Sequence, residues 1–130
     1  MTDGQFACQA TSCEFCEEKP CMKACPVNCS PADFIMAAKQ GNKSDIARAA
    51  AEIMTANPLG GVCGLICPNT YCQKACSHKA LDGKAIEIPK MQAYVINKAK
   101  ELGCTDSNFI TPNGIHDENH YTSAHDMALI

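Results

Sequence analysis

Apolar positions recur with helical spacing in three stretches of the chain. The clearest stretch carries an apolar stripe opposite charged residues, which is the pattern of a helix with one buried face. The stripe consists of Ile46, Ala49, Ala50, Ile53 and Met54. We therefore predict a helix that begins near Ser44 and ends before Pro58.

Two further helices are predicted on either side of this one. Ser30 offers an N-cap and Pro31 a first helical residue, and apolar positions continue until the chain approaches Gly41. This helix and the central one form a predicted hairpin, to which we assign packing only. The third helix is predicted from Pro89 to Leu102 and is closed by Gly103. Its apolar stripe consists of Ile88, Met91, Val95, Ile96, Ala99 and Leu102.

No alternating pattern of apolar and polar residues is long enough to indicate a strand, so we expect an all-α domain. We expect this domain to occupy residues 1–104. Residues 105–130 contain turn-forming residues and scattered apolar side chains, which predicts an irregular C-terminal extension. That extension is a candidate docking segment for a partner subunit.

Composition indicates that the core of this domain needs reinforcement. The chain has 130 residues, 5% aromatic residues and no Trp, so apolar burial depends on smaller side chains. It also has 11 cysteines, a density that is typical of either a disulfide scaffold or a metal protein.

The cellular context favours metal binding over disulfides. The sequence shows neither the regions of a secretory signal at Met1 nor an apolar run of membrane-spanning length. We therefore expect a cytoplasmic chain with no membrane contact, in which thiols stay reduced and dense cysteines are metal ligands. The formal net charge of −3, without a basic stripe, argues against nucleic acid as a partner.

Eight of the cysteines form two groups of four. The first group reads Cys13-x2-Cys16-x4-Cys21-x3-Cys25 and is followed by a proline. A cysteine run that ends in proline is similar to the run of bacterial ferredoxins, in which the last cysteine binds the neighbouring iron–sulfur cluster. The second group consists of Cys63, Cys67, Cys72 and Cys76.

Two metal chemistries suit these thiolates, iron–sulfur clusters and zinc. Cys21 and Cys25 are four residues apart, as are Cys72 and Cys76, so each pair on a helical turn would point between two adjacent clusters. An all-cysteine zinc module usually has two Cys-x2-Cys pairs, and only Cys13 and Cys16 form one here. Clusters are therefore favoured, and a zinc-stabilised interaction module is the alternative.

Most of the chain from Cys13 to Leu102 resembles one known domain. The resemblance rests on the first cysteine group, the helical hairpin, the stretch from Asn57 to Pro68, and Cys72, Cys76 and Gln92 in order. The domain is the N-terminal iron–sulfur domain of dihydropyrimidine dehydrogenase, which also occurs in the small subunit of NADPH-dependent glutamate synthase and in related transhydrogenases. The resemblance implies an alpha-helical ferredoxin-like domain wrapped around two [4Fe-4S] clusters.

The same resemblance implies a set of ligands for each cluster. One cluster would be held by Cys13, Cys16, Cys21 and Cys76, and the other by Cys25, Cys67, Cys72 and Gln92. Cys63 belongs to the family's motif but is not a ligand there. The segment between Cys67 and Cys72 is one residue shorter than in dihydropyrimidine dehydrogenase, a departure that concerns the second cluster.

Several other residues are assigned no ligand role. Cys8, Cys29 and Cys104 have no counterpart in the family, and we expect small buried side chains or free thiols. His78 lies close enough to Cys76 in sequence to bond a cluster sulfur, but a surface loop position is the expectation. The histidines of the extension are expected to be solvated; they are His116, His120 and His125.

The expected function is electron transfer without substrate chemistry. No catalytic constellation is apparent, and no G-x-G-x-x-G loop for FAD or NAD(P) follows Gly103. We therefore expect a non-catalytic subunit of an NAD(P)-linked oxidoreductase that relays single electrons to or from a flavoprotein partner. The alternative to a separate subunit is the truncated front end of a glutamate-synthase-like flavoenzyme.

Overall fold

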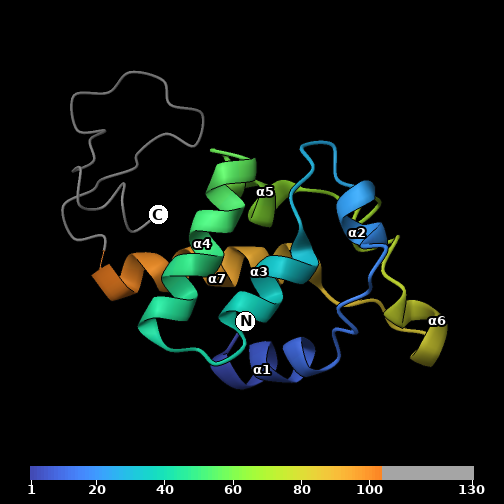
Figure 1. The fold of residues 1–130 in the computed structure, drawn as a ribbon, viewed down its shortest axis with the longest axis horizontal. Coiled ribbons are helices and arrows are strands. Elements are labelled where there is room, and N and C mark those ends of the chain that lie inside the picture. The colour runs from blue at the N-terminus through green and yellow to red at the C-terminus, as the bar shows by residue number, and fades with distance from the viewer. Residues whose placement is uncertain (104–130) are drawn as a thin grey trace.

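The computed structural model describes residues 1–103, the side chain of Asp82 excepted, and this part of the chain is helical without strands (Figure 1). This confirms the all-α prediction. The helices are α1 (Asp3–Thr11), α2 (Pro20–Lys23), α3 (Pro31–Ala38), α4 (Lys43–Ala56), α5 (Gly60–Ile66), α6 (His78–Asp82) and α7 (Ile88–Gly103). The predicted extension at 105–130, with its three histidines, and Cys104 lie outside the described residues, and the domain boundary stays a prediction.

The three helices predicted from periodicity are α3, α4 and α7, and their bounds agree with the predictions to within a few residues. α4 begins one residue earlier than expected because Asn42 is its N-cap, whose side-chain oxygen accepts a hydrogen bond from the Asp45 backbone nitrogen at 3.0 Å. α3 packs against α4, and α4 packs against α7. The hairpin therefore has the packing role expected of it.

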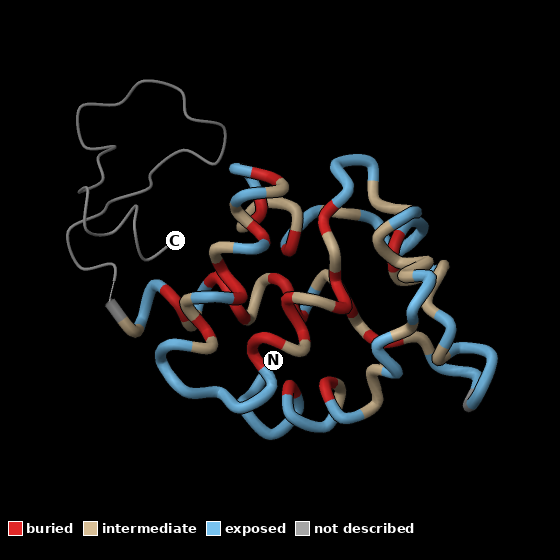
Figure 2. The backbone as a smooth tube through the Cα atoms, viewed as in Figure 1, coloured by how far each residue is buried: buried red, intermediate tan, exposed pale blue. Residues whose placement is uncertain are grey.

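The core lies where these three helices meet, as the buried segments in Figure 2 show. Its fully buried large side chains are Phe34, Ile35, Ile46, Ile53, Ile88, Met91 and Val95. Aliphatic side chains contribute most of this burial, as expected for a chain so poor in aromatic residues. Helices α2 and α6 contribute none of these fully buried side chains and lie together at one end of the view in Figure 1.

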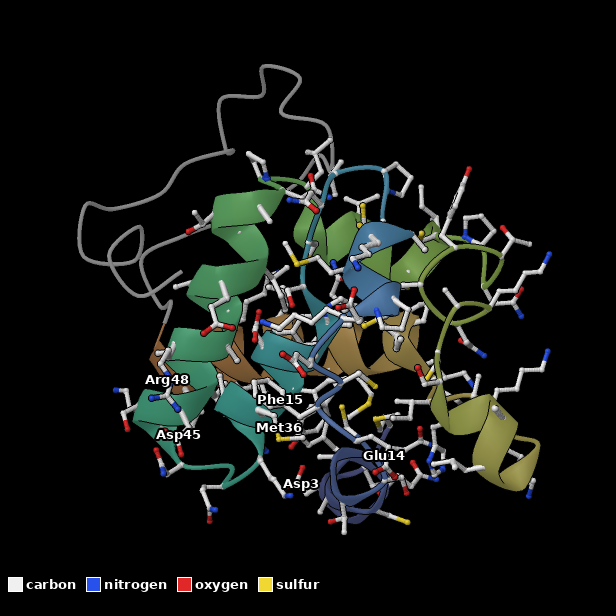
Figure 3. The ribbon with its side chains drawn as sticks, turned by 45° about the vertical axis from the view of Figure 1, so that its right-hand side comes forward. Asp3, Glu14, Phe15, Met36, Asp45 and Arg48 are labelled. Atoms are coloured by element: carbon white, nitrogen blue, oxygen red, sulfur yellow. The ribbon has the colours of Figure 1, made fainter. Side chains whose placement is uncertain are left out.

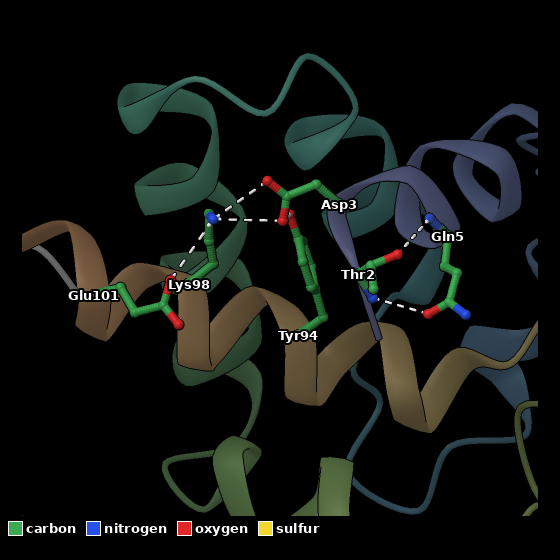
Figure 4. A network of polar contacts seen from close by, with 6 residues as sticks. All are labelled: Thr2, Asp3, Gln5, Tyr94, Lys98 and Glu101. Carbon is green, nitrogen blue, oxygen red and sulfur yellow. Dashed lines mark hydrogen bonds and ion pairs between the residues drawn. The ribbon is translucent and has the colours of Figure 1, made fainter.

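Helix α1 was not predicted, although the sequence carries a signal for it. Thr2 and Gln5 form a capping box, in which each side chain bonds the other residue's backbone nitrogen (Figure 4). The helix is fixed to α7 because the Phe6 ring stacks on the Tyr94 ring, with centroids 4.5 Å apart. The Tyr94 hydroxyl also donates to Asp3 at 3.1 Å. Burial and this carboxylate raise the pKa of Tyr94 to about 12.

Helix α5 approaches α7 more closely than side chains would permit. A Cβ atom at Gly64 would lie 2.5 Å from the Ala93 backbone nitrogen and 2.8 Å from its Cα. Glycine is a poor helix former, so the Gly-rich sequence of α5 gave no helical signal. Gly64 permits the close contact with α7, and Gly60 faces Ile53 of α4; these contacts place the segment that leads to Cys67.

Within the described residues, no single helix is both long and apolar enough to cross a membrane. Helices α4 and α5 together reach the required length and composition, but the chain bends by 89° between them.

Candidate metal centre

Four cysteines from separate parts of the chain line one cavity. Cys13 and Cys16 lie in the loop after α1, Cys21 lies in α2, and Cys76 precedes α6. These are the four residues that the family resemblance assigns to one cluster. The structure thus brings the set together, including Cys76, which is 55 residues beyond Cys21 in the sequence. Their role as ligands stays a prediction.

The loop that carries the first cysteines turns sharply around the cavity. Phe15 and Lys19 adopt positive φ angles of 46° and 42°, which non-glycine residues rarely do. The Lys19 ammonium holds this conformation by binding the Asp33 carboxylate of α3, at 2.7 and 2.8 Å. Lys19 also lies 5.5 Å from the centroid of the Phe15 ring. The ion pair therefore joins the loop to the helical hairpin.

The rest of the cavity wall is mostly apolar. Apolar side chains that contribute to it are Pro20, Pro31, Ala32, Ile35, Ile86 and Ile88. Burial raises the pKa values of Cys13 and Cys21 above that of an ordinary thiol, and nearby cysteines raise both further. Thiols in such a place are protonated until a metal displaces the proton, and soft thiolates suit iron–sulfur clusters. The cavity therefore fits a cluster held by four thiolates.

A second group of thiols lies around Cys72. Burial, followed by the charge of nearby Cys67, raises the pKa of Cys72 to about 12, and Cys25 adds to the effect. Burial also raises the pKa of Cys67, with Cys63 and Cys25 as its neighbours. Cys72 interacts with Cys21 of the first cavity as well, so the two groups are adjacent. Three of the four residues proposed for the second cluster are thus neighbours.

Two more thiols, Cys29 and Cys63, belong to this second group. The sequence pattern had not placed Cys29 in either group of cysteines. Cys29 is buried with 4% exposure, and burial together with Cys25, Cys72 and Cys63 raises its pKa to about 12. Cys63 accepts a hydrogen bond from the Asn57 side-chain nitrogen at 2.8 Å. The signal for Cys29 was its spacing, because it continues the four-residue interval from Cys21 to Cys25.

Gln92 is a buried polar residue of α7, next to Met91 of the apolar stripe. Its side-chain nitrogen donates to the Gly60 carbonyl oxygen at 2.7 Å. The buried amide therefore has the partner that burial requires, and this bond ties α7 to the first residue of α5. Ligation would use the other end of the amide, the oxygen.

His78 does not occupy the surface position that was expected. Its ring lines the first cavity together with the four thiols, and its side chain is 15% exposed. The expectation was wrong because His78 begins α6, which directs it back toward the loop after α1. Its Nδ1 lies 3.7 Å from a carboxylate oxygen of Glu14, which also lines the cavity. Cys8 is an exposed free thiol, which was one of the two expectations for it.

The spacing of the thiols bears on the zinc alternative. Among the described side chains, no group of three or more His, Cys, Asp and Glu is close enough to hold a single metal ion. Thiolates on one tetrahedral zinc ion would lie about 3.8 Å apart, because Zn–S bonds are about 2.3 Å long. A four-iron cluster takes each thiolate on a different iron and so suits thiols that are further apart. The ten cysteines described also form no disulfide.

Comparison with known families agrees with this chemistry. The family described as dihydropyrimidine dehydrogenase domain II, 4Fe-4S cluster, matches residues 1–104. The match confirms the resemblance inferred from the cysteine pattern, and it favours [4Fe-4S] clusters over zinc. Two adjacent groups of thiols, half-buried in the first group and including the buried Cys29 and Cys72 in the second, fit the expected number of two clusters.

Similar curated proteins are subunits of one dehydrogenase. The NAD-dependent dihydropyrimidine dehydrogenase subunit PreT of Escherichia coli K12 is 32% identical over 96 residues, which are 73% of this chain and 22% of that protein. PreT of Salmonella typhimurium is 34% identical over 88 residues, which are 67% of this chain and 20% of that protein. The chain therefore spans about a fifth of the length of these relatives.

Proposed function

Because the chain belongs to the family of dihydropyrimidine dehydrogenase domain II, a 4Fe-4S cluster domain, we propose that it relays single electrons between a flavoprotein and a further acceptor or donor. Two adjacent [4Fe-4S] clusters would carry these electrons, each changing its charge by one unit. The chain's own residues hold the clusters, keep water away from them and set their potentials.

The observation that carries this proposal is the pairing of thiols across the sequence. Cys76 comes from the second cysteine group, yet it lines the cavity of the first group with Cys13, Cys16 and Cys21. In turn Cys25, from the first group, is a neighbour of Cys67 and Cys72. This exchange places the two sites side by side, which suits the passage of electrons from one to the other.

The proposed ligands are those that the family resemblance implies, and the positions of the thiols support the cysteines among them. Cys13, Cys16, Cys21 and Cys76 hold the first cluster. The second cluster is held by Cys25, Cys67, Cys72 and Gln92. An amide oxygen as the eighth ligand leaves the second cluster about one charge unit less negative than a fourth thiolate would, and a less negative cluster has a higher potential.

The proposal of a flavin partner rests on the similar proteins. They are named as subunits of an NAD-dependent dehydrogenase, and this chain matches only about a fifth of their length. A nicotinamide delivers electrons in pairs and a cluster accepts one at a time, so a flavin is the usual group between them. The flavin therefore belongs to protein outside this domain.

Electron delivery from the partner tests the proposed function. The tagged full chain is isolated anaerobically from its own cells with the flavoprotein bound to it, and NADH or NADPH is then added. We expect the visible absorbance of the clusters to bleach only when flavoprotein and clusters are both present. Chain freed of the flavoprotein by salt is the control and should stay oxidised. Clusters that remain oxidised while the bound flavin is reduced would contradict the relay.

A further inference from the structure

One imidazole ring lies in the wall of the first thiol cavity. His78 contributes to this wall together with Cys13, Cys16, Cys21 and Cys76. Only 15% of its side chain is exposed, and its Nδ1 atom is fully buried. Because apolar side chains form most of the remaining wall, a polar hydrogen there acts in a place of low dielectric constant.

Two elements of the chain lie beside the ring, the ligand loop and α6. Glu14, labelled in Figure 3, lies between the ligand positions Cys13 and Cys16 in sequence. Its carboxylate is 3.7 Å from Nδ1 of His78. The backbone of His78 belongs to the first turn of α6, which ends at Gly83 with a φ of 79°. Glycine adopts this left-handed conformation without strain, so the short helix has a defined end. The ring therefore lies where the ligand loop and the first turn of α6 meet.

We infer that His78 is a positioning residue for the first cluster, whose sulfur accepts a hydrogen bond from a ring N–H of His78. The inference rests on the proposed function, because it requires a cluster on the four thiols of this cavity. A neutral imidazole keeps one N–H donor and a protonated one has two, so a donor is present in either form.

The consequence is a higher potential for the first cluster than it would have without this hydrogen bond. Reduction adds one negative charge to a cluster, and hydrogen bonds to its sulfurs stabilise the more negative state. The His78 bond therefore raises the potential of the first cluster. The proposed ligand oxygen of Gln92 raises the potential of the second cluster because it is neutral where a thiolate would be charged. A different residue therefore sets the potential at each site.

Two substitutions at His78 separate the hydrogen bond from simple packing. His78→Phe fills the place of the ring without a donor, and His78→Gln keeps an N–H group. A redox titration at fixed pH, followed by electron paramagnetic resonance, gives both cluster potentials. In His78→Phe we expect reduction of one cluster to become about tenfold less favourable, or 59 mV for one electron. The other cluster is the internal reference and should not change, and His78→Gln should retain most of the wild-type potential.

A second measurement starts from the wild-type chain, whose own result does not depend on how the variants fold. With ¹⁵N-labelled histidine, pulsed electron–nuclear resonance should detect nitrogen coupled to one reduced cluster, and His78→Gln should remove that signal. Unchanged potentials in a fully loaded His78→Phe, or no coupled nitrogen in the wild type, would overturn the inference while leaving the proposed function intact. A wild-type chain without four-iron clusters would instead refute the proposed function itself.

Discussion

Gly64→Ala should remove the second cluster and leave the first in place. A Cβ at this position meets the backbone nitrogen and Cα of Ala93, at 2.5 and 2.8 Å, and neither atom can move by a side-chain rotation. Helix α5 must therefore shift away from α7. Overpacking of this kind costs about 1–3 kcal/mol even where side chains can adjust.

The shift reaches the second site by two routes. Cys67 follows directly on α5 and would move with it. The carbonyl of Gly60, which accepts the hydrogen bond from Gln92, is at the beginning of the same helix. No residue of the first cavity belongs to α5.

Iron and acid-labile sulfide per chain measure the outcome. For Gly64→Ala we expect both to fall by about half, from about eight to about four, with the signals of one reduced cluster retained. Gly4→Ala is the matched control, because a Cβ at Gly4 in α1 meets nothing within 4 Å. The control should hold full iron and be slightly more stable, since alanine is the better helix former. Full iron in Gly64→Ala would show that the close contact of α5 with α7 does not support the second site.

Substitutions of Gln92 should distinguish a ligand from a packing amide. Gln92→Ala removes both the proposed ligand oxygen and the bond to the Gly60 carbonyl, so we expect the second cluster to be lost readily while the first stays. Gln92→Cys replaces a neutral ligand with a thiolate. That change should make the second cluster more negative and lower its potential.

Redox titration and iron counting of both variants are the measurements. Asn97→Ala is the control on α7, because Asn97 is exposed. If Gln92 only ties α7 to α5, both substitutions should destabilise the fold to a similar extent, with neither potential altered. Such a result would remove Gln92 from the ligands.

The main helices were predictable because their signals are local. Ile46 and Ile53 in α4, and Met91 and Val95 in α7, recur at the helical period, and both pairs are buried in the structure. Helix α1 had a local signal in Thr2 and Gln5, but it buries only Phe6 and Ala10 and so lacks a long apolar stripe. Helix α5 had none, since Gly60 and Gly64 disfavour a helix except where a neighbouring helix must come close.

The candidate site, like the fold, was predictable only where the sequence carries a local signal. Two groups of four cysteines and the likeness to a known domain were enough to predict the cofactor and to place Cys76 with Cys13. The position of His78 depends on where α6 turns back, which no local pattern specifies. Cys29 continues the four-residue spacing of Cys21 and Cys25, but its position near Cys72 and Cys63 depends on how the chain folds. Long-range contacts of this kind are set by packing, beyond the reach of spacing in the sequence.

The central claim is that this chain holds two [4Fe-4S] clusters, and the metal content of the wild-type protein tests it most directly. After anaerobic purification or reconstitution, we expect about eight irons and eight acid-labile sulfides per chain, with two reducible signals in electron paramagnetic resonance. A folded chain that contains stoichiometric zinc and no acid-labile sulfide would contradict the claim.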